Sequence, residues 1–412
     1  MYRKGEKFIK TMVKECIEQM KLCEHEKCTG CTACFSICPT NSITMKEDSY
    51  AEMHPFINNK TCIRCGLCMK ACPQMHMVKF YEPYICYAAW NSNHDDCINS
   101  SSGGVATLLA KSVIKQKGVY YGVEFSRNSG TYFKRITKYE EISRTQGSKY
   151  VQADLGLTFR EIGRDLSDNR LVMFVGSPCQ VAGLKKYVQY SRFNSYNNNL
   201  LTVDFLCHGT VPQKYLMEEI AFIEKKYSFK ADECIFRSNR PERNYRLTLL
   251  EKDTIFYQKR AENNIYFYCF LRAITCRDSC MNCEFKQKNR VGDITIGDFI
   301  GLGQEIPFDF ARGINPSLVF VNSEKGKTQI DSIIDKATLI NRPISEAVKG
   351  GPSLKKENLS SKQRSIFRRR YIKYGFISST NNLKYIMMIN MYISEFKSMF
   401  IKGTKKIIKR CK

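Results

Sequence analysis

The sequence contains no run of about 18 consecutive apolar residues, so we expect no transmembrane helix. Its first 21 residues, MYRKGEKFIKTMVKECIEQMK, are charged throughout and lack the apolar core of a secretory signal. Both absences predict a cytoplasmic chain, and structural disulfides are rare in that compartment.

Cysteine, in contrast, occurs 20 times in the 412 residues. In a cytoplasmic protein this abundance favours metal binding or redox chemistry over disulfides. The length predicts two or three domains with a substantial core, so a metal site here need not serve as a structural staple.

Acidic residues are nearly missing from the C-terminal end. The whole chain has a formal net charge of +25, and residues 361–412 contribute fourteen Lys or Arg against one acid, Glu395, which is 14 − 1 = +13. A basic segment of this kind binds an anionic membrane surface or nucleic acid, or is simply solvated.

Two cysteine runs dominate the N-terminal part: CTGCTACFSICP and CIRCGLCMKACP, which begin 34 residues apart. Each has the spacing C-x2-C-x2-C-x3-C-P, typical of bacterial ferredoxins with two [4Fe–4S] clusters, where the fourth cysteine of each run ligates the other cluster. The predicted ligands of one cluster are Cys28, Cys31, Cys34 and Cys72, and those of the other are Cys62, Cys65, Cys68 and Cys38.

The alternative for these runs is zinc, which usually takes two C-x2-C pairs rather than four-cysteine runs that end in C-P. Gly30 and Gly66 let the backbone pass close to sulfur, and NSITM after the first run predicts a short strand. Cys16 and Cys23 lie outside the motif, and we interpret them as ordinary thiols.

Two small polar loops follow in the larger part of the chain. The first, at residues 100–104, precedes a predicted helix, VATLLAKSVIKQ; it offers backbone amides and hydroxyls to a phosphate or a flavin, although plain helix capping is the alternative. The second contains Gly147, Ser148 and Lys149, for which a solvated loop is the alternative. Between the two loops, VYYGVEF and TYFKRIT predict a hairpin.

Two segments, LVMFVGSPCQVAGLKKYV and LLTVDFLCHGTVPQKYL, share the plan strand, turn, helix. Their strands are continuous apolar runs, as in a parallel sheet buried on both faces. Cys179 starts the first helix, and Cys207 and His208 follow the second strand. Because ligands bind beyond the carboxyl ends of such strands, both cysteines are expected at one rim.

A third cysteine set, in CRDSCMNCEF, comprises Cys276, Cys280 and Cys283. Three close cysteines need a distant partner for a four-ligand site, and Cys179 and Cys207 are the natural candidates. The options are a third [4Fe–4S] cluster, a structural zinc or free thiols. The strand predicted next, VGDITIGDFIG, carries two acids, Asp293 and Asp298, and Asp298 is expected to face the same rim.

Five motifs in order, SSGGVAT, QGSKYVQ, GSPCQVAGL, DFLCHG and CRDSCMNCEFKQKNRVGDITIGDFIG, resemble the beta subunits of coenzyme F(420) hydrogenases and dehydrogenases. The resemblance covers most of residues 25 to about 350. Within this family, the chain is most similar to stand-alone proteins with an N-terminal two-cluster ferredoxin, commonly encoded beside bacterial polysaccharide-synthesis genes.

The resemblance implies FAD and a nearby [4Fe–4S] cluster. The implied cluster ligands are Cys179, Cys207, Cys280 and Cys283, with Cys276 as an extra thiol or a substitute ligand. The implied flavin-lining residues are Ser101, Ser102, Gly103, Gly104, Gly147, Ser148 and Lys149. Lys149 would stabilise the reduced flavin, and His208 would supply a proton or serve as a hydrogen-bonding residue.

The family therefore implies an iron–sulfur flavoenzyme that passes electrons between a redox partner protein and a small-molecule or glycan-related substrate. Nothing in the sequence identifies the deazaflavin coenzyme itself. Two other classes stay open: a non-catalytic electron-transfer subunit that serves a partner enzyme, and a zinc-stabilised membrane adaptor that retains a ferredoxin module.

The expected fold class is α+β: a bacterial-type two-cluster ferredoxin, a larger mixed α/β flavin-binding domain and a basic helical tail. The predicted boundaries are 1–24 for a helical lead-in, 25–79 for the ferredoxin, 80–350 for the flavin and iron–sulfur domain, and 351–412 for the tail. The tail is expected to pack on the domain as a helix, with a peripheral membrane-surface helix as the alternative and nucleic acid disfavoured.

Overall fold

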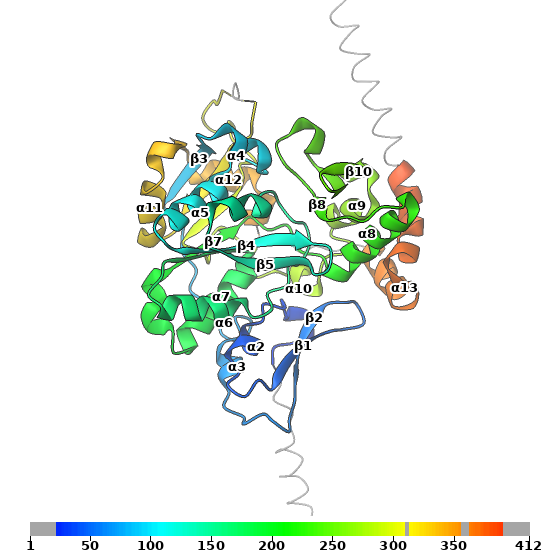
Figure 1. The fold of residues 1–412 in the computed structure, drawn as a ribbon, viewed down its shortest axis with the longest axis horizontal. Helices are drawn as coiled ribbons and strands as arrows, with labels where there is room; N and C mark the ends of the chain where they lie inside the picture. Colours follow the sequence, from blue (N-terminus) through cyan, green and yellow to red (C-terminus); the bar gives the residue numbers. More distant parts are fainter. Residues whose placement is uncertain (1–21, 310–312, 356–361, 390–412) are drawn as a thin grey trace, which may run out of the picture.

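The structure is a computed structural model that describes residues 22–309, 313–355 and 362–389. Most of the predicted lead-in, with Cys16, and the end of the basic tail lie outside these residues. The described parts form a mixed α/β body with a smaller N-terminal module below it (Figure 1).

The N-terminal module is built on one hairpin and three short helical turns. Strands β1 (Ile43–Glu47) and β2 (Met53–Ile57) pair antiparallel, from Ile43 opposite Ile57 to Glu47 opposite Met53. The short strand predicted from NSITM is thereby confirmed as β1. The helical turns are η1 (His25–Lys27), α2 (Ala33–Ile37) and α3 (Leu67–Lys70).

The body is organised around an eight-stranded sheet of order β13-β3-β12-β11-β7-β6-β4-β5. The strands β4, β6, β7 and β11 run parallel, and the remaining pairings are antiparallel. Their bounds are β3 (Ile85–Asn91), β4 (Val119–Ser126), β5 (Gly130–Ile136), β6 (Val172–Gly176), β7 (Leu200–Phe205), β11 (Ile294–Asp298), β12 (Ser317–Val321) and β13 (Ala337–Asn341).

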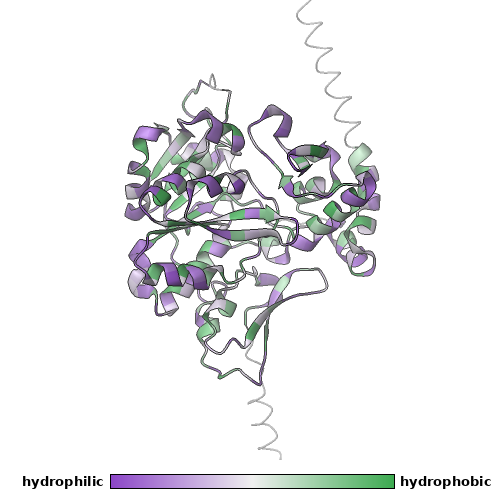
Figure 2. Cartoon of the chain, in the orientation of Figure 1, coloured by the Kyte–Doolittle hydropathy of each residue, from purple (hydrophilic) through white to green (hydrophobic). Residues whose placement is uncertain are grey.

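The parallel strands are buried on both faces, which confirms the interpretation of their continuous apolar runs. On β6, Met173 packs into one core, whereas Val172 and Phe174 pack into the core on the other face. The predicted hairpin is also confirmed, as β4 and β5. Figure 2 shows hydrophobic residues along these central strands and hydrophilic ones on the outer helices.

Helices cover both faces of the sheet. On one face α5 (Val105–Lys115) packs with the segment around α11 (Glu324–Asp331), and on the other lie α6 (Thr158–Ser167) and α7 (Pro178–Tyr190). The N-terminal module packs against this second face, since α2 contacts both α6 and α7. The smaller elements are α4 (His94–Asn99), η2 (Tyr139–Thr145), η3 (Asn194–Asn199), η6 (Ile334–Lys336), α12 (Ile344–Gly350) and η7 (Pro352–Leu354).

A separate core lies beside the sheet, around α8 (Gln213–Tyr227) and a three-stranded sheet of order β10-β9-β8. The other elements of this region are β8 (Glu233–Ile235), η4 (Pro241–Arg243), β9 (Arg246–Glu251), β10 (Thr254–Arg260), η5 (Ala261–Asn263), α9 (Ile265–Leu271) and α10 (Asp278–Met281). No pattern in the sequence predicted this second core as a separate unit.

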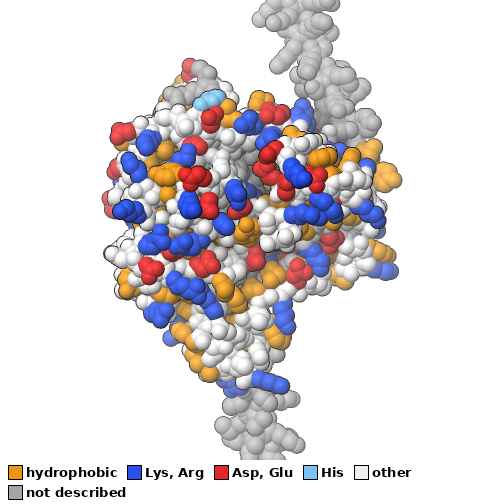
Figure 3. All heavy atoms as spheres, viewed as in Figure 1, with side chains coloured by type: hydrophobic (Ala, Val, Ile, Leu, Met, Phe, Trp, Pro, Cys, Tyr) orange, Lys and Arg blue, Asp and Glu red, His pale blue; other side chains and the backbone are white. Residues whose placement is uncertain are grey.

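The basic segment enters the same core through α13 (Lys362–Ser379). Its aromatic residues Phe367, Tyr371 and Phe376 surround the Tyr215 ring of α8 at centroid distances of 5.5, 4.5 and 5.6 Å. The start of the tail is therefore part of the folded body. Across the described residues, no helix has both the length and the apolar character that crossing a membrane requires. On the face seen in Figure 3, Lys and Arg are interspersed with Asp and Glu.

Candidate iron–sulfur and flavin sites

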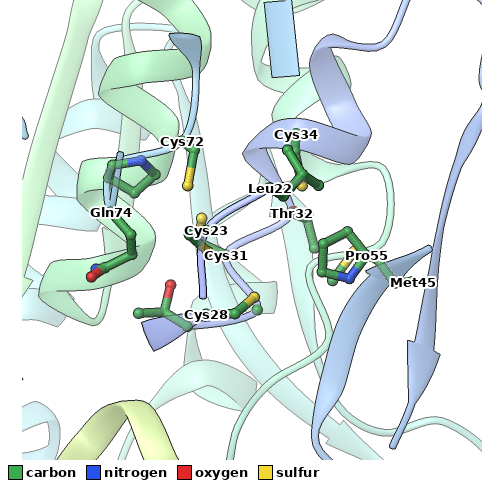
Figure 4. Close-up of a pocket in the computed structure, with 13 residues that line it drawn as sticks. Leu22, Cys23, Cys28, Cys31, Thr32, Cys34, Met45, Pro55, Cys72 and Gln74 are labelled. Atoms are coloured by element: carbon green, nitrogen blue, oxygen red, sulfur yellow. The ribbon is translucent and has the colours of Figure 1, made fainter. Parts of the chain in front are cut away.

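The first cysteine set lines one pocket inside the N-terminal module. Cys28, Cys31 and Cys34 reach it from the loop before α2 and from α2 itself, and Cys72 reaches it from the segment after α3 (Figure 4). Burial raises the pKa of Cys31 to about 12 and that of Cys34 well above its usual range. A bound iron cluster provides a positive charge that stabilises such buried thiols as thiolates.

Cys23 is a fifth sulfur in this pocket, and the sequence analysis treated it as an ordinary thiol. The figure shows its sulfur among those of Cys28, Cys31 and Cys72 (Figure 4). A hydrogen bond from Cys23 lowers the pKa of Cys28, and another lowers that of Cys72 to about 7. The one signal that could have located it is its position five residues before the first motif cysteine.

The second set, Cys38, Cys62, Cys65 and Cys68, lines a pocket at the other end of the module. The fourth cysteine of each run therefore lies with the first three of the other run, the crossed arrangement that the spacing predicts. This set is near the surface, since Cys65 is exposed and the neighbouring Ile63 is 63% exposed. We call the buried first set the inner set and this one the outer set.

The third set gathers five cysteines at the carboxyl edge of the parallel strands. Cys179 follows β6 at the start of α7, Cys207 follows β7, and Cys276, Cys280 and Cys283 flank or lie on α10. A Cβ on Gly209, two residues after Cys207, would be 3.0 Å from the Cys276 sulfur and 3.6 Å from the Cys280 Cβ. The pKa of Cys280 is raised mainly by burial and further by the charges of the other four cysteines.

Helix α7 joins the inner set to the third set. Gly183 lies four residues after Cys179, and a Cβ at this glycine would be 2.8 Å from the Cys31 sulfur. No side chain fits there, so the glycine allows the module to contact the helix that carries a cysteine of the third set. The pKa of Cys31 is also raised by Cys179, after burial and the inner-set cysteines.

Arg277 makes a second connection between the two sets. Its side chain is fully buried, and its guanidinium donates to Gln152 Oε1 at 2.7 Å and to the carbonyl oxygens of Cys28 and Met53 at 3.1 Å each. Cys276, the residue directly before Arg277, belongs to the third set. Arg277 therefore links a cysteine of the third set to the backbone of the inner set.

The two predicted flavin loops lie against each other. The Ser148 backbone N–H and hydroxyl are 2.7 and 2.9 Å from Ser101 Oγ, and Ser102 Oγ is 2.9 Å from Ser317 Oγ. A Cβ on Gly103 would be 2.0 Å from the Ala89 carbonyl, so only glycine fits there. The remaining glycines of the two loops, Gly104 and Gly147, both have positive φ, which glycine adopts at little cost.

Asn239 lies outside every motif that the sequence predicted, yet its side chain holds the first loop in place. Its side-chain amide donates to the carbonyls of Cys97 and Ser102, each at 2.8 Å. The backbone around residue 104 begins α5 without a side-chain cap, so its amides remain available to an anionic or polar ligand.

The two predicted catalytic residues have different surroundings. Lys149 donates to the carbonyls of Gln146 and Gly147 at 2.7 and 3.3 Å, and burial lowers its pKa to about 8. His208 packs edge-on against Phe270 at 5.3 Å, and burial and Lys286 lower its pKa.

The two acids at the ends of the β11 segment are both paired: Asp293 directly precedes the strand, and Asp298 is its last residue. Asp293 accepts from Thr202 Oγ1 at 2.6 Å, whereas Asp298 accepts from Arg237 at 2.5 Å at the carboxyl edge that also carries Cys207.

Two parts of the chain match known protein families. Residues 27–75 match the 4Fe-4S dicluster domain, and residues 169–347 match the family described as the C terminus of the coenzyme F420 hydrogenase/dehydrogenase beta subunit. A protein of Methanosarcina mazei, named as one of the subunits of F(420)H(2) dehydrogenase, is 22% identical over 209 residues, or 48% of this chain and 58% of that protein.

An uncharacterized protein of Methanocaldococcus jannaschii is also 22% identical, over 38% of this chain and 51% of its own length. The chain thus spans a little over half the length of these curated relatives. A chain of the F420-reducing [NiFe] hydrogenase complex from Methanosarcina barkeri aligns at 12% identity with a TM-score of 0.42, over 75% of this chain and 95% of that one. Residues 169–347 are thus similar to the C terminus of coenzyme F420 hydrogenase/dehydrogenase beta subunits, and residues 27–75 are similar to a 4Fe-4S dicluster domain.

Proposed function

We propose that this chain is an iron–sulfur flavoprotein that transfers electrons between a partner protein at its outer cysteine set and a flavin in its larger domain. The observation that carries the proposal is the order of the three cysteine sets. The outer set includes an exposed cysteine, the inner set abuts α7, and the third set starts on that same helix.

The proposed ligands are the two ferredoxin sets already defined, with Cys179, Cys207, Cys280 and Cys283 for a third cluster. When bound, [4Fe–4S] clusters carry single electrons, and a flavin converts between one- and two-electron chemistry. The protein's own residues hold these groups and limit access of water. Burial of the third set leaves its thiolates dependent on the positive charge of bound iron.

The proposed flavin site is the contact between the loop of residues 101–104 and the loop of residues 147–149. The unfilled backbone amides at the start of α5 and the hydroxyls of Ser101 and Ser148 suit a phosphate or the polar edge of a flavin ring. In this proposal Lys149 orients the second loop through its two carbonyl contacts. Its amine would stabilise the reduced flavin. His208, next to Cys207, is proposed as a proton donor or acceptor.

A partner protein would dock at the exposed end of the module. Ile63, which lines the pocket of the outer set, is 63% exposed, and apolar side chains around a redox centre favour transient contact with another protein. The relative named as a subunit of a dehydrogenase supports the second candidate, an electron-transfer subunit that serves a partner enzyme. A small-molecule or glycan-related substrate is the class that the sequence resemblance suggests, and peripheral membrane contact through the basic tail is a further part of the proposal.

The deciding experiment quantifies iron, acid-labile sulfide, zinc and released flavin per chain on protein purified without oxygen. About twelve irons and one flavin are expected from three cubane clusters and one flavin site. About eight irons without flavin would refute the flavoprotein and leave an electron-carrying ferredoxin with an appended domain.

Activity then separates the two candidate classes. Photochemically reduced ferredoxin and the reduced deazaflavin coenzyme are offered as electron donors, with a dye as acceptor. Turnover by the isolated chain supports an enzyme, whereas reduction of its clusters without turnover, together with a stable complex on pull-down, supports a non-catalytic subunit.

A further inference from the structure

Three side chains outside the cysteine sets converge in the N-terminal module. His25 lies in η1, Asp48 in the turn between β1 and β2, and His54 on β2. One possible ligand atom from each lies within 4.8 Å of the others. Asp48 Oδ2 is 3.4 Å from His25 Nε2 and 3.7 Å from His54 Nε2.

The backbone holds the Asp48 carboxylate in one orientation. Its Oδ1 accepts hydrogen bonds from the N–H groups of Tyr50 and Glu52 at 2.8 and 2.9 Å. The second oxygen, Oδ2, is buried without a hydrogen-bond partner, and so is His54 Nε2. One oxygen is therefore fixed by the turn, and the other is directed at two imidazoles.

The distances fit metal ligands better than hydrogen bonds. Hydrogen bonds between nitrogen and oxygen are usually about 2.7–3.2 Å long, shorter than both contacts. Ligand atoms about 2.0–2.1 Å from a tetrahedral zinc ion are roughly 3.3 Å apart, close to the two contacts.

The two imidazole rings lie next to each other beside the carboxylate. They stack with centroids 3.7 Å apart and planes at 11°. Because a lone pair lies in its ring plane, we expect the rings to tilt apart when an ion binds.

We propose that His25, Asp48 and His54 bind a divalent transition metal ion, for which Zn²⁺ is the probe. Two imidazoles and one carboxylate are a common donor set for zinc with an open fourth position. The His25 carbonyl accepts a hydrogen bond from the Cys28 backbone N–H at 3.2 Å, so the ion would lie near a cysteine of the inner set. The proposal does not depend on the flavin or on the third cluster.

The test uses the full-length, iron-loaded protein without oxygen. Zinc is added at one equivalent, unbound metal is removed, and zinc and iron are quantified. X-ray absorption at the zinc edge then identifies the ligands. We expect about one retained zinc with nitrogen and oxygen at about 2.0–2.1 Å and no sulfur at about 2.3 Å.

Two variants address the site directly. Asp48→Asn keeps an oxygen for the two backbone contacts but removes the charge, and His25→Gln changes an exposed side chain that is not a proposed ligand of the inner set. Both are expected to weaken zinc binding at least tenfold with iron content unchanged. His94→Gln, at an exposed histidine that begins α4, is the matched control and should retain zinc.

Three results would overturn the proposal: no zinc retained, a sulfur shell around the zinc, or equal zinc binding by wild type and His25→Gln. If Asp48→Asn loses iron, His25→Gln alone decides, because its side chain is 55% exposed. Sulfur neighbours in the X-ray absorption spectrum would show that zinc occupies a cysteine set instead of the His25–Asp48–His54 site. This result would refute the zinc site without testing the electron-transfer proposal.

Discussion

The guanidinium of Arg277 donates a hydrogen bond to the carbonyl oxygen of Cys28, with Nη2 and O 3.1 Å apart. These residues are 249 positions apart in the sequence, and they join the CRDSC segment to the inner cysteine set. A buried network extends this contact: Arg368 of α13 binds both Glu52 of the module and Asp278 of α10, each at 2.7 Å. The basic segment thus contributes charges to the junction between the two parts.

Arg277→Met should destabilise the iron-loaded protein by about 3–5 kcal/mol, as expected when one partner of a buried charged network is lost. The change removes the donor to Cys28, Met53 and Gln152 and leaves Glu52 with one fewer cation. Denaturant unfolding under anaerobic conditions measures this loss of unfolding free energy. Arg260→Met, at an exposed arginine, is the control, and equal effects of the two would contradict a role of Arg277 at the junction.

Arg368→Ala should release α13 from the junction at a cost of about 3 kcal/mol. The side chain is 11% exposed, pairs with two acids and lies 3.5 Å from the centre of the Tyr50 ring. Hydrogen exchange should rise in α13 and in the β1–β2 turn together. Lys373→Ala, at an exposed position on the same helix, should leave exchange unchanged. A rise confined to α13 would mean that the helix does not support the module.

Gly183→Ala should weaken the contact between the module and α7, because the added methyl group would overlap Cys31. Overpacking of this kind costs roughly 1–3 kcal/mol. The midpoint temperature of thermal unfolding should decrease, and so should the rate of electron transfer from the ferredoxin clusters to the larger domain. Gln189→Ala changes an exposed residue of the same helix and serves as the comparison. Wild-type behaviour of Gly183→Ala would show that the two parts are not in tight contact.

Cys276→Ala and Cys280→Ala should differ in iron content. We expect Cys280→Ala to lose about four of twelve irons, because it removes a proposed cluster ligand. Cys276→Ala should keep all twelve, since this buried thiol is not among the four proposed ligands of the third cluster. Iron analysis with electron paramagnetic resonance of the reduced protein gives the answer. The reverse result would exchange the roles of the two cysteines.

Lys149 should make stability depend on alkaline pH. Burial lowers its pKa from 10.5 to about 8, so between these values the unfolded chain binds a proton that the folded chain does not. The free energy of unfolding must then rise with pH, by up to roughly 3 kcal/mol between pH 8 and 10.5. Denaturant unfolding of wild type and Lys149→Met without added flavin should show this rise only in wild type. If the difference in free energy of unfolding between wild type and Lys149→Met does not change with pH, the amine keeps its ordinary pKa.

Much of the architecture could be predicted because its signals are local. The β4–β5 hairpin, the buried parallel strands and the two ferredoxin runs each follow from the spacing of neighbouring residues. Cysteine spacing of two and three residues restricts which thiols can reach one centre, so the sequence predicts the crossed inner and outer sets that the structure places together.

The sequence by itself thus determined the ferredoxin module, the parallel sheet with Cys179 and Cys207 at its edge, and the resemblance to the family. Tertiary structure decided the rest. Cys23 joins the inner set, Asn239 holds the first flavin loop, and His25, Asp48 and His54 meet, although no periodicity links these residues in the chain. Such contacts depend on how separate elements pack, and packing brings together residues whose separation in sequence carries no information about their distance.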